Sequence, residues 1–353
     1  MESGRTAALG AKFKNILVIR PDRIGDVILS TPVFQALSER LPRARVTALV
    51  AWEVAPLIEG LPGVSEVLPL DRRRGFMGWV SLFQERRFDA VVFLHPHPKL
   101  ALAARLAGIP VRVGPLSKPY SFVLFNAGIR QRRSQVEKHE AQYNLDLLSA
   151  LGLPVGEFSP EKFPTRIVVK EEARDWARDW LEKRGLDASA MGKLVAVHPG
   201  MGGSAQNWPM ASYRELVHRL IGSGYIVLGT FGPAEHALAD ELGLGKNFAY
   251  LAGPNDPIQN LVGLLCFAKV VVAPSTGPLH IAVALGKRVV GLYPENPIQE
   301  SPRRWGPYGV AGERAAVLTP GARGGDMSTL GVPAVLDQVM AQMKYENENP
   351  SPR

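Results

Sequence analysis

The stretch Val270-Val271-Val272-Ala273-Pro274-Ser275-Thr276-Gly277-Pro278-Leu279-His280 decides the fold. Its apolar run predicts a buried parallel strand that leads directly into a helix. Ser275 or Thr276 can cap the first turn, and Pro278 is tolerated there because its missing amide is not needed. A helix start presents free amides and a partial positive charge, which suits a phosphate. An ordinary strand, turn and helix without a ligand explains the same stretch, because capping residues open most helices.

The composition is that of a globular protein, and a chain of 353 residues is long enough for two domains. Apolar residues make up 46% of the chain, yet no apolar run approaches the roughly 18 residues of a membrane span. The polar segment up to Lys14 lacks the apolar core of a signal peptide, so we expect a cytoplasmic protein. The single cysteine, Cys266, lies in an apolar helical pattern typical of a buried thiol.

Basic charge is concentrated in the first half of the chain. Residues 1–160 contain 21 Lys and Arg against 14 Asp and Glu, whereas the remainder is nearly balanced. This excess indicates an anionic partner for the first half, unless the basic runs are simply solvated faces. Nucleic acid is not favoured, because no helix-turn-helix, zinc-finger or RNP-like signature is present. A phosphorylated glycolipid at a membrane surface would satisfy the same charge.

Strands and helices alternate in two successive sets. Apolar runs predict strands at 15–20, 44–50, 64–70 and 89–94, and then at 194–198, 225–231, 249–251, 270–273 and 288–293. Helical patterns lie at 27–41, 99–107, 141–151 and 170–184, begin again near 211, 234, 257 and 278, and recur at 333–345. The alternation predicts two doubly wound, Rossmann-like α/β domains with parallel sheets and right-handed crossovers.

A segment dense in Pro and Gly, 153–164, marks the linker between the two domains. We therefore expect a first domain at 1–160 and a second at 161–332, facing each other across a cleft. The final segment, 333–353, is expected to hold a helix that returns across the first domain and a frayed tail from Glu346 onward. Ligands of such sheets bind beyond the carboxyl ends of the strands, so the loops there are the candidate sites.

In the first domain the candidate loop is Arg20-Pro21-Asp22-Arg23-Ile24-Gly25-Asp26. Asp26 is placed where the opening helix starts, so it can be a helix cap. A carboxylate at the mouth of a cleft can instead take a proton from an acceptor hydroxyl. Asp22 is a competing carboxylate, although its place after Pro21 is typical of a turn.

In the second domain the candidate loop runs from His198 to Pro209 and contains three glycines that let backbone approach a ligand. It matches neither the dinucleotide fingerprint nor the P-loop. Glu235, after the next strand, can accept hydrogen bonds from a ribose or base, or can serve as a first-turn helix carboxylate. His280 either packs in the core or meets a phosphate bound at the helix start.

Together these residues resemble glycosyltransferase family 9, the ADP-heptose lipopolysaccharide heptosyltransferases. The resemblance rests on Arg23-Ile24-Gly25-Asp26, Trp208-Pro209, Glu235, the Ser275–His280 element and Trp305-Gly306-Pro307. It implies a two-domain GT-B fold and an inverting bacterial transferase that moves heptose from a nucleotide-activated donor to the inner core of lipopolysaccharide. It further implies that Asp26 is the general base, that Glu235 contacts the nucleoside, and that the helix start binds the diphosphate.

The candidate residues form two groups. The donor group comprises Gly202, Ser204, Gln206, Glu235, Ser275, Thr276, Gly277 and His280. The acceptor group comprises Arg23, His95, His97, Lys99, Arg112 and Lys118, which can bind an anionic glycolipid at the inner membrane surface. Gln206 replaces a lysine, and Ser275 an aspartate, found in many family members. The missing lysine weakens stabilisation of the departing diphosphate, and backbone amides with His280 can offset part of that loss.

No carboxylate pair lies near the diphosphate loops, and no Cys/His zinc spacing occurs, so we expect no metal or other cofactor. The implied mechanism is a single displacement with Asp26 as base. One rival is a GT-B nucleotide-sugar epimerase, which needs no acceptor; the basic first half argues against it. Another is a non-catalytic nucleotide-sugar-binding protein, against which the presence of Asp26 argues.

Overall fold

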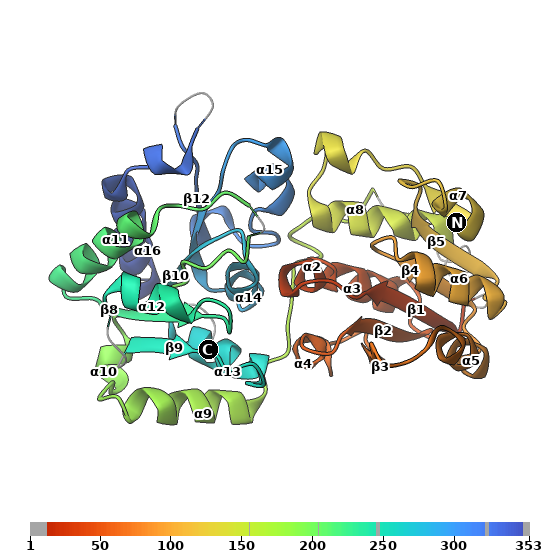
Figure 1. The fold of residues 1–353 in the computed structure, drawn as a ribbon, viewed down its shortest axis with the longest axis horizontal. Coiled ribbons are helices and arrows are strands. Elements are labelled where there is room, and N and C mark those ends of the chain that lie inside the picture. Colours follow the sequence, from red (N-terminus) through yellow and green to blue (C-terminus); the bar gives the residue numbers. More distant parts are fainter. Residues whose placement is uncertain (1–12, 155, 204, 245–247, 322–324, 349–353) are drawn as a thin grey trace. The chain divides into compact units, whose positions relative to one another are not determined.

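The protein is described by a computed structural model that covers residues 13–154, 156–203, 205–244, 248–321 and 325–348. The chain divides into two compact α/β units between Val168 and Val169 (Figure 1). The sequence places the boundary slightly earlier, after residue 160. Residues 161–168 still belong to unit 1, because Phe163 is buried there and the amide of Val168 donates to the carbonyl of Leu57 at 2.7 Å.

Unit 1 contains one parallel sheet of six strands in the order β3-β2-β1-β4-β5-β6. The strands are β1 Asn15–Arg20, β2 Arg45–Ala51, β3 Glu66–Leu70, β4 Ala90–Phe93, β5 Val111–Pro115 and β6 Ala127–Ile129. The central strands β1 and β4 are almost entirely buried, as expected for parallel strands covered on both faces. Strands β5 and β6 are not predicted by the apolar runs, because both are short and contain Gly.

The helices of unit 1 are α2 Ile24–Ile28, α3 Thr31–Arg40, α4 Ala55–Ile58, α5 Phe76–Arg86, α6 Pro98–Leu106, α7 Ser121–Leu124 and α8 Glu140–Asp146. The single helix expected over 27–41 is broken into α2 and α3. Pro32 lies in the first turn of α3, and the Thr31 hydroxyl donates to the carbonyl of Ile28 at 2.8 Å. The helix expected over 141–151 ends early and continues as a 3₁₀ segment, Leu147–Leu151.

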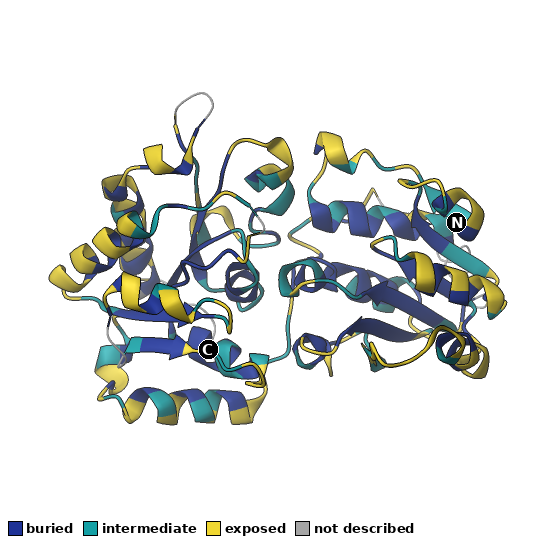
Figure 2. Ribbon diagram, viewed as in Figure 1, coloured by how far each residue is buried: buried dark blue, intermediate teal, exposed yellow. Residues whose placement is uncertain are grey.

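Helices α5, α6 and α7 cover the same face of the unit 1 sheet (Figures 1 and 2). Alternate residues of β1 and β4, such as Leu17 and Phe93, pack there against Phe83, Leu100 and Phe125. Because side chains alternate between the faces of a strand, this packing fixes the orientation of the central strands. Because β1 and β4 pair in parallel, their carboxyl ends lie side by side at one edge of the sheet.

Unit 2 repeats this topology. Its parallel strands are β7 Leu194–Val197, β8 Ile226–Phe231, β9 Ala249–Leu251, β10 Val270–Pro274, β11 Arg288–Leu292 and β12 Ala315–Leu318. They lie in the order β12-β11-β10-β7-β8-β9. The two central strands, β7 and β10, pair with each other and correspond to β1 and β4 of unit 1. The two doubly wound sheets confirm the predicted fold class.

Helices cover both faces of the unit 2 sheet. They are α9 Glu171–Glu182, α10 Ala188–Met191, α11 Met210–Gly222, α12 His236–Leu242, α13 Ile258–Phe267, α14 Gly277–Ala284, α15 Pro302–Trp305 and α16 Val332–Glu348. Helices α9 and α13 approach so closely that a Cβ at Gly263 would lie 2.1 Å from the carbonyl oxygen of Ala173. Within the described ranges, no helix is long and apolar enough to cross a membrane.

The last helix, α16, belongs to unit 2 and corrects the expected start of the tail. It packs against α11, β10 and β11, and Val335, Val339 and Met343 belong to the core there. Glu346 is not part of a frayed tail: it is 2% exposed and accepts a hydrogen bond from the buried Arg288 at 3.1 Å. A buried arginine on β11 needs a charged partner, and α16 supplies it.

Candidate active site

The two candidate sites lie where the strand order of each sheet reverses. In unit 1 this point lies between β1 and β4, and in unit 2 between β7 and β10. Ligands of doubly wound sheets bind in the crevice beyond the strands at this position. The loop after β1 carries Arg23 and Asp26, and the segment after β4 carries His95 and His97. Both segments thus follow the two central strands of the unit 1 sheet.

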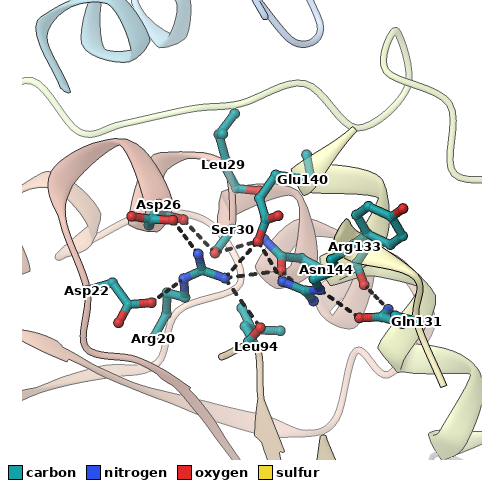
Figure 3. Close-up of polar contacts among 12 residues, drawn as sticks. Arg20, Asp22, Asp26, Leu29, Ser30, Leu94, Gln131, Arg133, Glu140 and Asn144 are labelled. Atoms are coloured by element: carbon teal, nitrogen blue, oxygen red, sulfur yellow. Dashed lines mark hydrogen bonds and ion pairs between the residues drawn. The ribbon is translucent and has the colours of Figure 1, made fainter. Parts of the chain in front are cut away.

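Asp26 lies in the first turn of α2 and does not cap the helix. Arg23 is the N-cap residue, and the Asp26 carboxylate instead forms an ion pair with Arg20 at the end of β1 (Figure 3). Arg20 is 2% exposed, and its Nε lies 2.8 Å from Oδ2 of Asp22. Both carboxylates of the loop are thus held by one buried guanidinium, which limits their freedom to move.

A second layer of polar side chains comes from α8 (Figure 3). Arg20 Nη1 lies 3.2 Å from Oε1 of Glu140 and 3.3 Å from Oδ1 of Asn144. Glu140 is 1% exposed and also accepts a hydrogen bond from Arg133 Nη1 at 2.6 Å. The Asn144 amide donates to the carbonyl of Leu29, which ties α8 to the turn after α2. Glu140 and Asn144 therefore position Arg20, and Arg20 positions Asp26.

The environment of Asp26 favours a proton acceptor. Burial raises the pKa of its carboxyl above the ordinary value; the positive charge of Arg20 offsets part of this increase, and the negative charges of Asp22 and Glu140 add to it. The side chain remains 20% exposed, so a bound molecule can reach it. A general base works best when its pKa approaches the operating pH, and a raised carboxyl pKa moves Asp26 in that direction.

The other acceptor candidates of unit 1 do not all lie at this edge. His95 is exposed after β4, and His97 Nδ1 accepts a hydrogen bond from the amide of Leu100 at 3.2 Å as the N-cap of α6. Lys99 and Lys118 are exposed in segments that follow β4 and β5, and Arg23 is exposed after β1. Arg112 lies near the start of β5, where its guanidinium donates to the carbonyls of Ile109 and Leu124, so it holds β5 and α7 together.

A hollow of about 500 Å³ lies at the same edge of the sheet, beyond β2 and β3. It is lined by Trp52, Pro69, Leu70, Asp71, Arg72 and Arg73. Trp52 is 53% exposed, which is unusual for so large an apolar side chain. An indole face beside two arginines suits a ligand that carries both apolar carbon and negative charge.

In unit 2, Glu235 is held against the glycine loop that follows β7. Its Oε2 accepts a hydrogen bond from the amide of Gly232 at 2.8 Å, and a Cβ at Gly200 would lie 2.1 Å from its Oε1. Gly200 therefore leaves the space that the carboxylate occupies. His198 is buried beside it, with Nε2 3.7 Å from Oε2 of Glu235.

His198 is held in a defined orientation. Its Nδ1 lies 2.8 Å from the carbonyl oxygen of Thr230, which assigns the proton to Nδ1 and leaves Nε2 as the unprotonated nitrogen toward Glu235. Burial lowers the pKa of His198, and Glu235 opposes this effect. In this tautomer Nε2 has no proton to donate to Glu235, so the neutral ring forms no ion pair with the carboxylate.

The remainder of the loop is anchored at its far end. Asn207 Nδ2 donates to the carbonyl of Pro199 at 2.6 Å, and the buried Trp208 indole donates to the carbonyl of Leu330 at 2.8 Å. Gly202 is exposed and has a positive φ of 54°. Gln206 is also exposed, and its backbone amide donates to Oε2 of Glu300 at 3.0 Å. Ser204, a donor candidate, lies outside the described residues.

The start of α14 leaves its first amides without a cap from Thr276. Thr276 occupies the N-cap position, but its hydroxyl donates to the carbonyl of Pro274 at 3.2 Å instead. The Ser275 side chain is hydrogen-bonded to Tyr293. Among the described residues, no side chain caps α14 from its N-cap position, and Gly277 remains partly exposed for an anion. His280 is one turn further in and only 3% exposed.

Arg20 and His198 open the two candidate loops but received no role from the sequence, and Glu140 and Trp52 were not among the candidates at all. Arg20 ends an otherwise apolar strand, and a charged residue there signals a buried ion pair. Its partner Glu140 lies 120 residues away, which no local pattern indicates. Within the described ranges, no group of three or more His, Cys, Asp or Glu residues is placed to hold a metal ion.

The chain is similar to known proteins of one enzyme family. The family model for glycosyltransferase family 9 (heptosyltransferase) matches residues 80–318. A putative glycosyltransferase of Haemophilus influenzae is 32% identical over 326 residues, covering 90% of this chain and 92% of that protein. The chain belongs to glycosyltransferase family 9. The resemblance read from the sequence is thereby confirmed, and the protein is a glycosyltransferase.

Two further relatives place the chain within the family. Lipopolysaccharide heptosyltransferase 2 of Salmonella typhimurium is 28% identical over 306 residues, covering 80% of this chain and 83% of the relative. The structure of E. coli ADP-heptose lipopolysaccharide heptosyltransferase II has a TM-score of 0.76 at 23% identity, covering 94% of this chain and 99% of that one. The two doubly wound units of this family 9 protein are thus those of a GT-B fold.

Proposed function

We propose that this family 9 protein is an inverting transferase that moves a heptose, or a related sugar, from ADP-heptose to an anionic glycan such as the lipopolysaccharide inner core. The observation that carries the proposal is Asp26, a mostly buried carboxylate with a raised pKa at the switch point of unit 1. Arg20 forms an ion pair with Asp26, and Glu140 and Asn144 in turn hold Arg20 in place. The Asp26 side chain stays 20% exposed. This arrangement suits a base that accepts a proton from a bound hydroxyl.

The proposed reaction is one displacement. The acceptor hydroxyl oxygen forms a bond to the anomeric carbon while the bond from that carbon to the diphosphate oxygen breaks. Asp26 takes the hydroxyl proton, and the diphosphate leaves with the bonding electrons. Attack opposite the leaving group inverts the anomeric carbon, and donors at the departing oxygens stabilise the growing charge.

The donor is proposed to occupy unit 2. The amides at the start of α14 and the exposed Gly202 segment suit a diphosphate, and the fixed Glu235 carboxylate suits the hydroxyls of a ribose. Gln206 and Ser275 carry no charge, so the backbone amides and His280 would provide most of the stabilisation of the leaving group. The name of the structurally similar E. coli ADP-heptose lipopolysaccharide heptosyltransferase II supports this choice of nucleotide sugar.

The acceptor is proposed to occupy unit 1. His95, Lys99, Lys118 and Arg23 are exposed near the carboxyl edge of the sheet, and Arg72 and Arg73 line the hollow beside Trp52. An inner-core glycan carries carboxylates and phosphates that these cations can bind. The names of the lipopolysaccharide heptosyltransferase relatives support an acceptor of this class. We propose in addition that this acceptor is presented at the inner membrane surface.

Transfer is proposed to need no divalent cation, because the amides of α14 act on the diphosphate directly. Addition of EDTA should leave the rate unchanged, and an increase in rate with Mg²⁺ or Mn²⁺ would contradict this part of the proposal.

The function is tested by incubating the purified protein with ADP-heptose, ADP-glucose or UDP-N-acetylglucosamine, with and without a deacylated inner-core acceptor. Mass spectrometry should detect an acceptor heavier by one heptose, together with ADP, only when ADP-heptose and acceptor are both present. Release of a free sugar without acceptor would indicate an epimerase. Tight nucleotide-sugar binding with no product would indicate a binding protein. Added salt should weaken acceptor binding more than nucleotide binding.

A further inference from the structure

Helices α6 and α7 of unit 1 expose apolar side chains next to basic ones. Leu102 and Leu106 lie four residues apart, on the same side of α6, and are 41% and 54% exposed. Phe122 and Val123 on α7 are 54% and 62% exposed. Figure 2 shows both helices with exposed outer sides over the buried sheet. We call these four residues, with Arg105 and Arg130, the α6–α7 patch.

The α6–α7 patch is one continuous surface. The Arg105 guanidinium on α6 donates to the carbonyl of Val123 on α7 at 2.9 Å. The Arg130 guanidinium lies over the ring of Phe122, 5.6 Å from its centroid. Because the inner sides of both helices are packed on the sheet, their apolar outer residues are not needed to complete the core. Such an exposed apolar group flanked by polar residues is typical of an interaction site.

The chain segment that forms the α6–α7 patch carries charge of a single sign. From Ala90 to Val136 the chain contains seven Lys and Arg and no Asp or Glu. Lys99, in the first turn of α6, and Lys118, three residues before α7, are both exposed within this stretch. A twofold contact between two copies would bring these cations together without compensating carboxylates. An anionic lipid surface instead neutralises them and buries the leucines, Phe122 and Val123 among acyl chains.

We propose that the α6–α7 patch docks this protein on an anionic phospholipid bilayer, with the four apolar side chains inserted at the headgroup boundary. This docking deepens the proposed function and rests on it, because a transferase that acts on a lipid-linked acceptor meets that acceptor at a membrane. Docking itself requires neither the donor nor the acceptor. It places unit 1, where the acceptor is proposed to bind, on the bilayer.

The test is co-sedimentation of the full chain with acceptor-free vesicles of phosphatidylcholine containing phosphatidylglycerol, or of phosphatidylcholine alone. The protein should bind the anionic vesicles at least tenfold more tightly than the neutral ones, and 0.5 M salt should remove most of this preference. The double substitution Phe122→Ser and Val123→Ser should weaken binding at least fivefold. The matched control is Ile221→Ser on α11 of unit 2, which removes a 49% exposed side chain and should change nothing.

Hydrogen exchange of the unaltered protein provides a second measurement that does not depend on a variant folding. Anionic vesicles should protect the amides of α6 and α7 and leave those of α11 unchanged. No vesicle binding, or protection confined to other elements, would overturn the proposal. It would also be overturned if the double variant lost a dimer in light scattering but kept its affinity for vesicles. Transfer to a deacylated acceptor without vesicle binding would reject docking and leave the proposed function intact, whereas docking without transfer would reject the function alone.

Discussion

The carboxylate of Glu140 lies 3.2 Å from the guanidinium of Arg20, and Arg20 in turn forms an ion pair with Asp26. A buried glutamate on α8 therefore controls a carboxylate at the start of α2 through one intervening cation. Arg133 shares the same glutamate oxygen at 2.6 Å. The arrangement gives Glu140 a positioning role.

The variant Glu140→Gln should change the pH profile of transfer as well as the stability. The negative charge of Glu140 raises the pKa of Asp26, so its removal lowers that pKa. Activity requires deprotonated Asp26 and falls as pH decreases through its pKa; the acid limb should therefore move to lower pH. Loss of the shared carboxylate should also reduce the free energy of unfolding by about 1–3 kcal/mol.

The matched control for Glu140→Gln is Glu137→Gln, because Glu137 is exposed in the same segment. Rates measured from pH 4 to 8 and urea unfolding check both expectations. An unchanged acid limb in a folded Glu140→Gln protein would show that Glu140 is structural only.

The variant Gly200→Ala should displace Glu235. The new Cβ would lie within about 2.2 Å of all three atoms of the Glu235 carboxylate, which must move away from Gly232. Nucleotide affinity should fall by about tenfold, a loss typical of a hydrogen bond to a charged group. Isothermal calorimetry with ADP and adenosine should show the same loss for both ligands. Gly222→Ala, where the added Cβ meets nothing within 4 Å, is the control and should bind normally.

The variant His280→Ala should weaken ADP binding by about tenfold or more but change adenosine binding less than about twofold, since the proposed contact is to the diphosphate. The control His218→Ala alters an exposed histidine on α11 and should affect neither ligand. Equal losses for ADP and adenosine would refute a diphosphate role for His280.

The variant Glu346→Ala should destabilise the protein by about 3–5 kcal/mol, because it leaves the buried Arg288 without its carboxylate. Glu348→Ala, on the same helix but exposed, should lie within about 0.5 kcal/mol of the parent. Thermal unfolding measures both effects. Equal melting temperatures for the two variants would show that the ion pair of Glu346 with Arg288 does not stabilise unit 2.

Local sequence patterns predict the secondary structure well where strands are apolar and loops contain Gly and Pro. They predict β1, β10 and the turn into α14, because each of these depends on neighbouring residues alone. They miss β5, whose run includes Arg112 and Gly114, and the break after α2 at Ser30. They also cannot show that Glu346 is buried, since its partner Arg288 lies on β11, 58 residues away in sequence.

The candidate sites show the same limit. Sequence patterns locate Asp26 and Glu235 beyond strand ends, where ligand loops occur. They do not show that Arg20 and Glu140 set the environment of Asp26, or that Gly200 accommodates Glu235, because these are contacts between elements. Arg112 illustrates the converse error: its charge suggested an acceptor contact, but its guanidinium is used by backbone carbonyls.

The most direct test of the proposed function compares Asp26→Asn with the parent in the transfer assay and in nucleotide calorimetry. Asparagine keeps the shape of the side chain but cannot accept the hydroxyl proton. Transfer should fall by at least about a hundredfold, the usual contribution of a general base, while ADP affinity stays within about threefold. Undiminished transfer by Asp26→Asn, with ADP affinity unchanged, would contradict the assignment of Asp26 as the base.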